Sequence, residues 1–158
     1  MNTTKPLEGK YLSVLLQGES YALSVLKVRE IVRIPKINPL PHLPSYVRGV
    51  MNLRGQVIPV IDLRSRFGLQ SELGERTCVV VANVATSRGL ERPMGMIVDG
   101  VEDVAFISGA DIEPPPFLRA GATSCLLGMA KSKGQVKLLL DVDRIDDPDA
   151  LTAGARAA

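Results

Sequence analysis

The sequence contains two weak copies of one pattern, and this repeat restricts the possible folds more than any other feature. Residues 49–62 align with residues 128–141 at an offset of 79, and each copy gives a strand, a basic residue with glycine, and an apolar strand ending in aspartate. Residues 21–34 align with residues 94–107 at an offset of 73. Two matches in the same order predict two similar small β-barrels packed together, since neither half alone could bury a large core.

Short runs with strand character dominate the chain. Residues 11–16 and 21–25 flank a glycine turn, as do residues 49–53 and 56–61, and each pair predicts a β-hairpin. Further strands are expected at residues 77–84, 94–98, 101–107, 124–130 and 135–140. Short helical turns are expected at residues 26–29, 45–48 and 62–67. The pattern is that of an all-β protein.

The chain offers little for catalysis. His42 is the single histidine, which excludes a multi-histidine metal site and leaves histidine acid–base chemistry to one loop residue. The acidic candidates are Glu30, Glu102 and Asp103, together with Asp62, Asp99 and Asp141. The last three lie at the ends of predicted strands, where aspartate commonly caps or forms the following turn. We therefore expect structural aspartates, no enzymatic activity and no cofactor.

Charge and hydropathy restrict the partners and the compartment. Nineteen basic residues against seventeen acidic ones give a net charge of +2, too balanced for a protein that binds nucleic acid electrostatically. The N-terminus lacks the apolar stretch of a secretory signal, and apolar runs fall short of the roughly 20 residues of a membrane helix. Cys78 and Cys125 lack metal-ligand spacing and are expected to be reduced structural thiols. These features predict a cytoplasmic protein that does not insert into the membrane.

Several residues have the character of binding groups. Arg54 precedes a glycine at a predicted hairpin tip, where its side chain projects into solvent and is either merely solvated or used for recognition. Ile37, Leu40, Leu43 and Phe117 are apolar residues in proline-rich loops. Such residues either plug a barrel or anchor a partner, and of the two the plug is favoured.

A set of motifs runs along nearly the whole chain. The most specific is Gly-Val-x-Asn-Leu-Arg-Gly at residues 49–55, followed by Pro-Val-Ile-Asp-Leu-Arg at residues 59–64. Further motifs occur in order at residues 26–31, 98–104, 112–116 and 138–141. Together they resemble the CheW family of bacterial chemotaxis coupling proteins, and the resemblance covers residues 9–147.

The resemblance implies an all-β fold of two small five-stranded SH3-like barrels packed together, with short helical turns and a short C-terminal helix. A single CheW-like domain would span residues 9–147. Its two intertwined barrels would comprise residues 20–85 and residues 9–19 plus 93–147. Residues 1–8 and 148–158 would be flexible tails.

The resemblance also implies a non-catalytic scaffold, monomeric in isolation and recruited to receptor arrays at the inner face of the membrane. Its partners would be the regulatory domain of the histidine kinase CheA and the cytoplasmic tips of chemoreceptors, the methyl-accepting chemotaxis proteins. Gly49 would let a receptor helix approach closely, and Glu30 and Arg48 would form a charged rim. The receptor-binding residues implied are Val28, Glu30, Arg48, Gly49, Arg54 and Val98, and the kinase-binding residues are Ile37, Leu40 and Phe117.

Two alternatives stay open. The chain could be the adaptor of a chemosensory pathway that controls motility or development, because the same scaffold chemistry would serve either output. A small-barrel RNA-binding protein would need clustered basic residues and stacking aromatic rings. Three tyrosines, three phenylalanines and no tryptophan argue against that second alternative.

Overall fold

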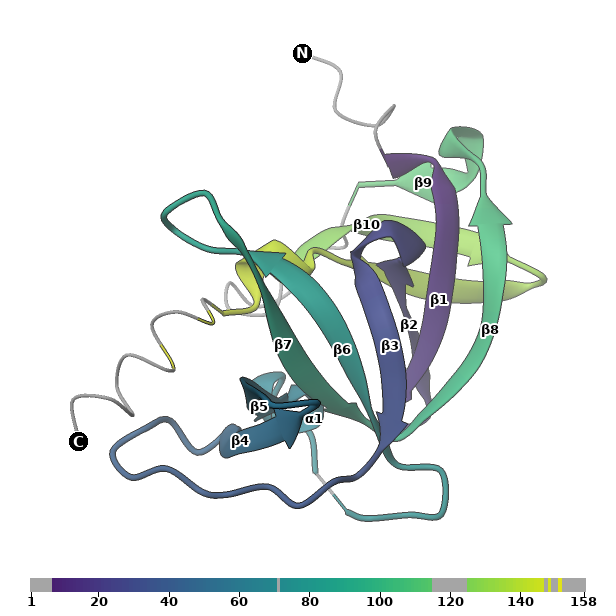
Figure 1. The fold of residues 1–158 in the computed structure, drawn as a ribbon. Coiled ribbons are helices and arrows are strands. Elements are labelled where there is room, and N and C mark those ends of the chain that lie inside the picture. The colour runs from purple at the N-terminus through teal and green to yellow at the C-terminus, as the bar shows by residue number, and fades with distance from the viewer. Residues whose placement is uncertain (1–6, 71, 115–124, 147, 149–150, 152–158) are drawn as a thin grey trace.

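The computed structural model describes residues 7–70, 72–114, 125–146, 148 and 151, and these form two packed sheets (Figure 1). The six-stranded sheet A has the order β8-β1-β2-β11-β10-β9, and the five-stranded sheet B has the order β3-β6-β7-β5-β4. The strands of sheet A are β1 (Gly9–Leu16), β2 (Glu19–Ser24), β8 (Gly100–Ile107), β9 (Ile112–Glu113), β10 (Leu126–Ser132) and β11 (Gln135–Leu140). Those of sheet B are β3 (Val28–Arg33), β4 (Val47–Leu53), β5 (Gln56–Asp62), β6 (Cys78–Ala85) and β7 (Glu91–Val98).

The two sheets follow one plan, which confirms the duplication. Strands β8, β1, β2, β11 and β10 of sheet A occupy the same order as β3, β6, β7, β5 and β4 of sheet B. Each sheet has its parallel pairing at the same place, between β11 and β2 or between β5 and β7. The predicted all-β class is therefore confirmed. Among the described residues, no strand pairing joins the two edges of either sheet, so the barrels are open.

The chain crosses between the sheets at places that differ from the expected boundaries. Strand β2 lies in sheet A and leads into β3 of sheet B, whereas β7 lies in sheet B and leads into β8 of sheet A. The division into residues 20–85 and residues 9–19 plus 93–147 therefore put β2 and β7 into the wrong halves. Antiparallel pairing keeps the hairpins β1–β2 and β6–β7 together, and the chain changes sheets only after each hairpin.

The core has three parts because strands of both sheets bury both faces. Alternate residues of a strand point to opposite sides, so on β6 Val80 enters a core shared by the two sheets, whereas Val79 and Val81 enter a core inside sheet B. A third cluster, which includes Tyr11 and Leu139, fills sheet A.

In the described part of the chain, three short helical elements lie between strands: η2 (Val25–Lys27), α1 (Leu63–Arg66) and η3 (Gly109–Asp111). A fourth, η4 (Val142–Arg144), follows β11. The expected turn at residues 62–67 is present as α1, and Asp62 caps it by accepting from the backbone N–H groups of Arg64 and Ser65. The expected helical turn at residues 45–48 is present only as a single turn at residues 45–46, closed by the backbone N–H of Val47 donating to the Pro44 carbonyl oxygen at 3.0 Å. Val47 begins β4 there, because it pairs with Ile61 and is buried in the shared core.

The packed part of the chain reaches beyond residue 147. Leu151 is buried in the shared core, whereas the family resemblance implies a flexible tail at residues 148–158. The segment before it is held by Arg66, whose Nε donates to the carbonyl oxygen of Ile145 at 3.2 Å and whose guanidinium lies over the Tyr46 ring. The remainder of the expected C-terminal helix lies outside the described residues.

Candidate functional site

The edge strands β3 and β8 present apolar side chains on the faces that meet in the shared core. Ile31 pairs with Val80 and Val104 pairs with Leu12, and residues directly opposite in a ladder share a face. Both partners belong to the shared core. Ile31 is nevertheless 45% exposed, Val104 54% and Phe106 60%. We define the edge strip as Val28, Ile31, Val101, Val104 and Phe106.

Sequence reasoning found Val28 in this strip but missed Ile31, Val104 and Phe106. The signal was the alternation of charged and apolar residues along both strands, which marks one face of each. Burial cannot be read from that alternation, because an edge strand has a neighbouring strand on one side only and its side chains are covered only where other parts of the fold pack on them. Val98, by contrast, is expected in the receptor site but does not lie at the surface. It is fully buried in the shared core and cannot touch a partner directly.

Arg54 is not the unpartnered hairpin-tip residue that the sequence predicts. Its guanidinium forms two hydrogen bonds with the Glu30 carboxylate, at 2.5 and 2.9 Å. The pair joins the β4–β5 turn to β3, the opposite edge of sheet B, and so bridges the open barrel. The hydrogen bonds from Arg54 lower the pKa of Glu30 below its ordinary value.

Sheet A has a similar bridge at the equivalent place. Lys133, at the tip of the β10–β11 hairpin, contacts Asp103 on β8 at 3.4 Å, and the buried Lys137 lies 3.5 Å from the same carboxylate. Arg54 and Lys133 share the left-handed backbone conformation, each with a φ of 52°. An ion pair between a hairpin tip and an edge strand is therefore part of the repeated plan.

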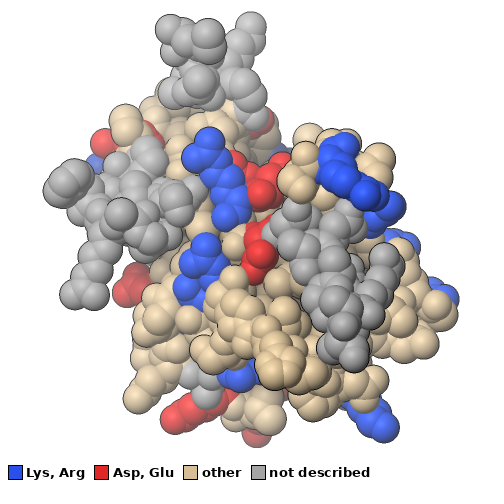
Figure 2. Space-filling view, turned by 90° about the vertical axis from the view of Figure 1, so that its left-hand side faces the viewer, with Lys and Arg blue, Asp and Glu red and all other residues tan. Residues whose placement is uncertain are grey.

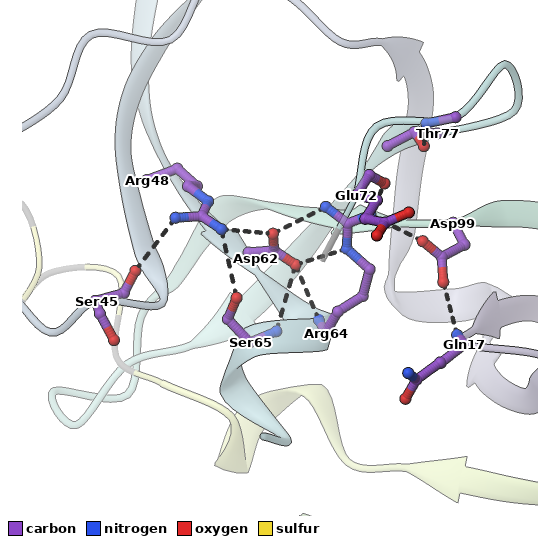
Figure 3. Close-up of polar contacts among 10 residues, drawn as sticks. Gln17, Ser45, Arg48, Asp62, Arg64, Ser65, Glu72, Thr77 and Asp99 are labelled. Atoms are coloured by element: carbon purple, nitrogen blue, oxygen red, sulfur yellow. Dashed lines mark hydrogen bonds and ion pairs between the residues drawn. The ribbon is translucent and has the colours of Figure 1, made fainter. Parts of the chain in front are cut away.

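Arg48 belongs to a different cluster from Glu30, which pairs with Arg54; Figure 3 shows the Arg48 cluster. Arg48 donates to Asp62 at 3.0 Å, and Arg64 holds the same carboxylate through two hydrogen bonds of 2.9 Å. Arg64 also donates to Asp99 at 2.8 Å and to the Glu72 carbonyl oxygen at 2.6 Å. Asp62 and Arg64 are buried, which makes this the main charged centre of sheet B.

Burial raises the pKa of Asp62, but the hydrogen bonds and charges of Arg64 and Arg48 outweigh it, and the pKa lies below its ordinary value. A lowered pKa contributes stability that is present above the unfolded-state value of about 4 and is lost as pH falls through the folded-state value. The protein should therefore lose stability as the pH falls below about 4. Urea unfolding at several pH values should show a flatter profile for Asp62→Asn, and an unchanged profile would contradict this assignment.

A hollow of about 440 Å³ lies beside this charged centre. Ile37 forms part of its wall and also packs on the core of sheet B, so the residue is both a plug and a surface group. Leu40 is half-buried in the same loop but does not line the hollow, and Phe117 lies outside the described residues. The hollow is lined by Ile34, Pro35, Ile37, Pro39, Arg48, Asp62, Arg64, Leu73 and Ile97.

Gly49 does not provide space for a partner. Its φ is +138°, and a Cβ there would overlap with the carbonyl oxygen of Asn38. Asn38 and Val50 exchange backbone hydrogen bonds of 2.8 and 2.9 Å, which hold the β3–β4 loop against β4. Gly128, its counterpart in the repeat, would similarly place a Cβ 2.6 Å from the Glu113 carbonyl oxygen. At both glycines the missing side chain allows another backbone segment of this chain to pack closely, at Asn38 and Glu113 respectively.

Within the described ranges, no helix is long and apolar enough to cross a membrane. The same part of the chain holds no group of three or more acidic, histidine or cysteine residues placed to bind a metal. On the face shown in Figure 2, basic and acidic side chains are interspersed rather than gathered into one basic patch.

Comparison with known proteins decides the family. The sequence matches the family model of the CheW-like domain over residues 10–148. The chain belongs to the CheW family. A chemotaxis protein CheW from Klebsiella aerogenes is 33% identical over 138 residues, which are 86% of this chain and 80% of the relative. The crystal structure of the scaffolding protein TtCheW from Thermoanaerobacter tengcongensis superposes with a TM-score of 0.79 at 30% identity, covering 87% of this chain and 92% of that one.

CheW proteins are non-catalytic scaffold or adaptor proteins of chemotaxis, and the family implies interaction with other chemotaxis signalling components. The structural roles of Asp62 and Asp141, as helix caps and ion-pair partners, agree with membership of a non-catalytic family. Protein FrzA from Myxococcus xanthus, 36% identical over 109 residues, shows that relatives are not all named as chemotaxis proteins. The aligned region is 68% of this chain and 64% of Protein FrzA.

Proposed function

We propose that this protein couples chemoreceptors to the histidine kinase CheA, with the edge strip receiving a receptor tip. The observation that carries the proposal is the exposure of the apolar residues Ile31, Val104 and Phe106 on the edge strands β3 and β8. A helical receptor tip presents apolar residues at helical spacing and fits such a face. The nearby Glu30–Arg54 pair supplies a polar border.

The hollow beside Arg48 is the proposed contact for the regulatory domain of CheA. Its apolar wall can accept an apolar side chain, and Leu73 stands on its rim with 77% of its surface exposed. Exposed large apolar residues beside a pocket are typical of interface anchors. Leu40 and Phe117 remain predicted kinase contacts on the strength of the family resemblance.

Val104→Asp is expected to weaken binding of a receptor cytoplasmic fragment at least about tenfold, because it places a charge in an apolar contact. Calorimetric titration measures the affinity, and a melting curve checks the fold. Val57→Asp is the matched control, since Val57 is comparably exposed on β5 outside the strip. Equal affinity for the two variants would contradict the receptor site.

Leu73→Glu is expected to weaken binding of the CheA regulatory domain by about tenfold or more, for the same reason. Leu73 suits this test better than Ile37, because Ile37 also packs on the core and its replacement would disturb the fold. Val136→Glu, on an exposed position of sheet A, is the control. If Leu73→Glu binds the kinase domain as tightly as the control, the hollow is not the kinase contact.

A second candidate is the same adaptor role in a pathway with another output. The similarity to Protein FrzA favours keeping it. A deletion strain distinguishes the two: loss of chemotaxis with other motility intact supports the first candidate, and the reverse supports the second.

A further inference from the structure

The helical turns α1 and η4 follow equivalent hairpins of the two sheets. Asp62 caps α1, and Asp141 caps η4 by accepting from the backbone N–H of Asp143. Asp62 and Asp141 are matched by the repeat, and two positions later so are Arg64 and Asp143. The repeat therefore places opposite charges at equivalent points of the fold.

Each of these two charges reaches the segment where the chain passes from one sheet to the other. Arg64 contacts Asp99, between β7 and β8, at 2.8 Å. Asp143 contacts Lys27 of η2, between β2 and β3, at 2.9 Å. In Figure 1, β3 runs downward and β8 runs upward from the point where β3 ends, so one contact lies at the upper start of β3 and the other at the lower start of β8.

The two crossovers differ in burial. The Arg64 side chain is 3% exposed, whereas that of Lys27 is 23% exposed and that of Asp143 36%. Lys27 also contacts Glu91 at 3.3 Å, and Asp143 accepts from the backbone N–H of Ala85 at 2.8 Å. Lys27 and Asp143 thus tie η2 to β6, β7 and η4 through contacts that water and salt reach.

We propose that Lys27 and Asp143 form a positioning pair for the edge strip. Val28, the first strip residue, directly follows Lys27, and its backbone N–H closes η2 by donating to the Val25 carbonyl oxygen. Holding Lys27 therefore holds the start of β3 in place. Burial lowers the pKa of Lys27, but contacts with Asp143 and Glu91 outweigh it and raise the pKa above its ordinary value, so the ammonium stays charged. The functional consequence rests on the receptor site proposed above.

The test uses Asp143→Asn, which removes the charge but keeps an oxygen to accept from Ala85, and Lys27→Met. Amide hydrogen exchange of Val28, followed by NMR, is expected to be about threefold faster in both variants, the size typical of an exposed ion pair. Raising salt from about 0.05 to 0.5 M should speed exchange in the wild type and not in either variant. Lys133→Met, which removes the exposed contact with Asp103, is the matched control and should leave Val28 exchange unchanged.

Receptor-fragment affinity is measured on the same variants and should fall about threefold in Asp143→Asn and Lys27→Met. Unchanged Val28 exchange in these variants would overturn the positioning pair, whatever Val104→Asp does. Faster exchange with unchanged affinity, while Val104→Asp still weakens binding, would also overturn it. If Val104→Asp leaves receptor binding intact, the proposed receptor site fails, and the exchange result alone decides whether the pair holds η2.

Discussion

Replacing Arg64 with methionine is expected to lower the free energy of unfolding by about 3–5 kcal/mol, the range for a broken buried ion pair. Arg64 is buried and makes hydrogen bonds to Asp62, Asp99 and the Glu72 carbonyl oxygen. Methionine fills similar volume but removes the hydrogen bonds that Arg64 donates, and it leaves the fully buried Asp62 carboxylate with Arg48 as its remaining ion-pair partner. Urea unfolding monitored by circular dichroism measures the effect.

Arg64→Lys separates charge from geometry. Lysine keeps the positive charge but cannot reproduce the several directed hydrogen bonds of a guanidinium, so an intermediate loss is expected. Arg54→Met is the control, because it removes an arginine from an exposed ion pair in the same sheet. The importance of the buried centre would be refuted if Arg64→Met unfolded at the same urea concentration as Arg54→Met.

Replacing Gly49 with alanine is expected to cost about 3 kcal/mol or more, from backbone strain together with overpacking. The backbone there has a φ of +138°, and the added Cβ would overlap with the Asn38 carbonyl oxygen. The β3–β4 loop would have to move and lose its hydrogen bonds between Asn38 and Val50. Since this loop carries Ile37, kinase binding should weaken together with stability.

Two other glycines calibrate that result. Gly55 has a φ of +84°, and a Cβ added there would meet no other atom. Gly55→Ala is therefore expected to cost only backbone strain, about 1–2 kcal/mol. Gly128→Ala meets the Glu113 carbonyl oxygen and should also be destabilising, as the repeat requires. A Gly49→Ala protein with wild-type unfolding and reduced receptor affinity would restore the original prediction that a receptor helix approaches this glycine.

Hairpins and strand-end aspartates could be predicted from the sequence because each depends on a few neighbouring residues. The glycine turn between β4 and β5 and the capping of α1 by Asp62 are local features of this kind. The fold class followed because the repeat and the strand pattern gave the same answer, and family membership followed from the motif at residues 49–64.

The candidate site could be predicted only in part. The family resemblance identified Arg48, Gly49 and Arg54, but not their contacts: Arg48 holds Asp62, Arg54 holds Glu30, and Gly49 lies against the Asn38 carbonyl oxygen. Val98 shows the same limit, because an apolar residue at a strand end can equally face a core or a partner, and here it is fully buried.

The sequence by itself determined the all-β class, the duplication, the capping aspartates and the CheW motifs, since each is encoded by adjacent residues or by a repeat. Only the tertiary structure decided that Glu30 pairs with Arg54, that Asp143 reaches Lys27, and that the strands are exchanged between sheets. These contacts join residues far apart in the chain, and which of them form depends on the packing of the whole shared core. A linear pattern carries no information on that choice, because the same charge or apolar side chain satisfies several arrangements equally well.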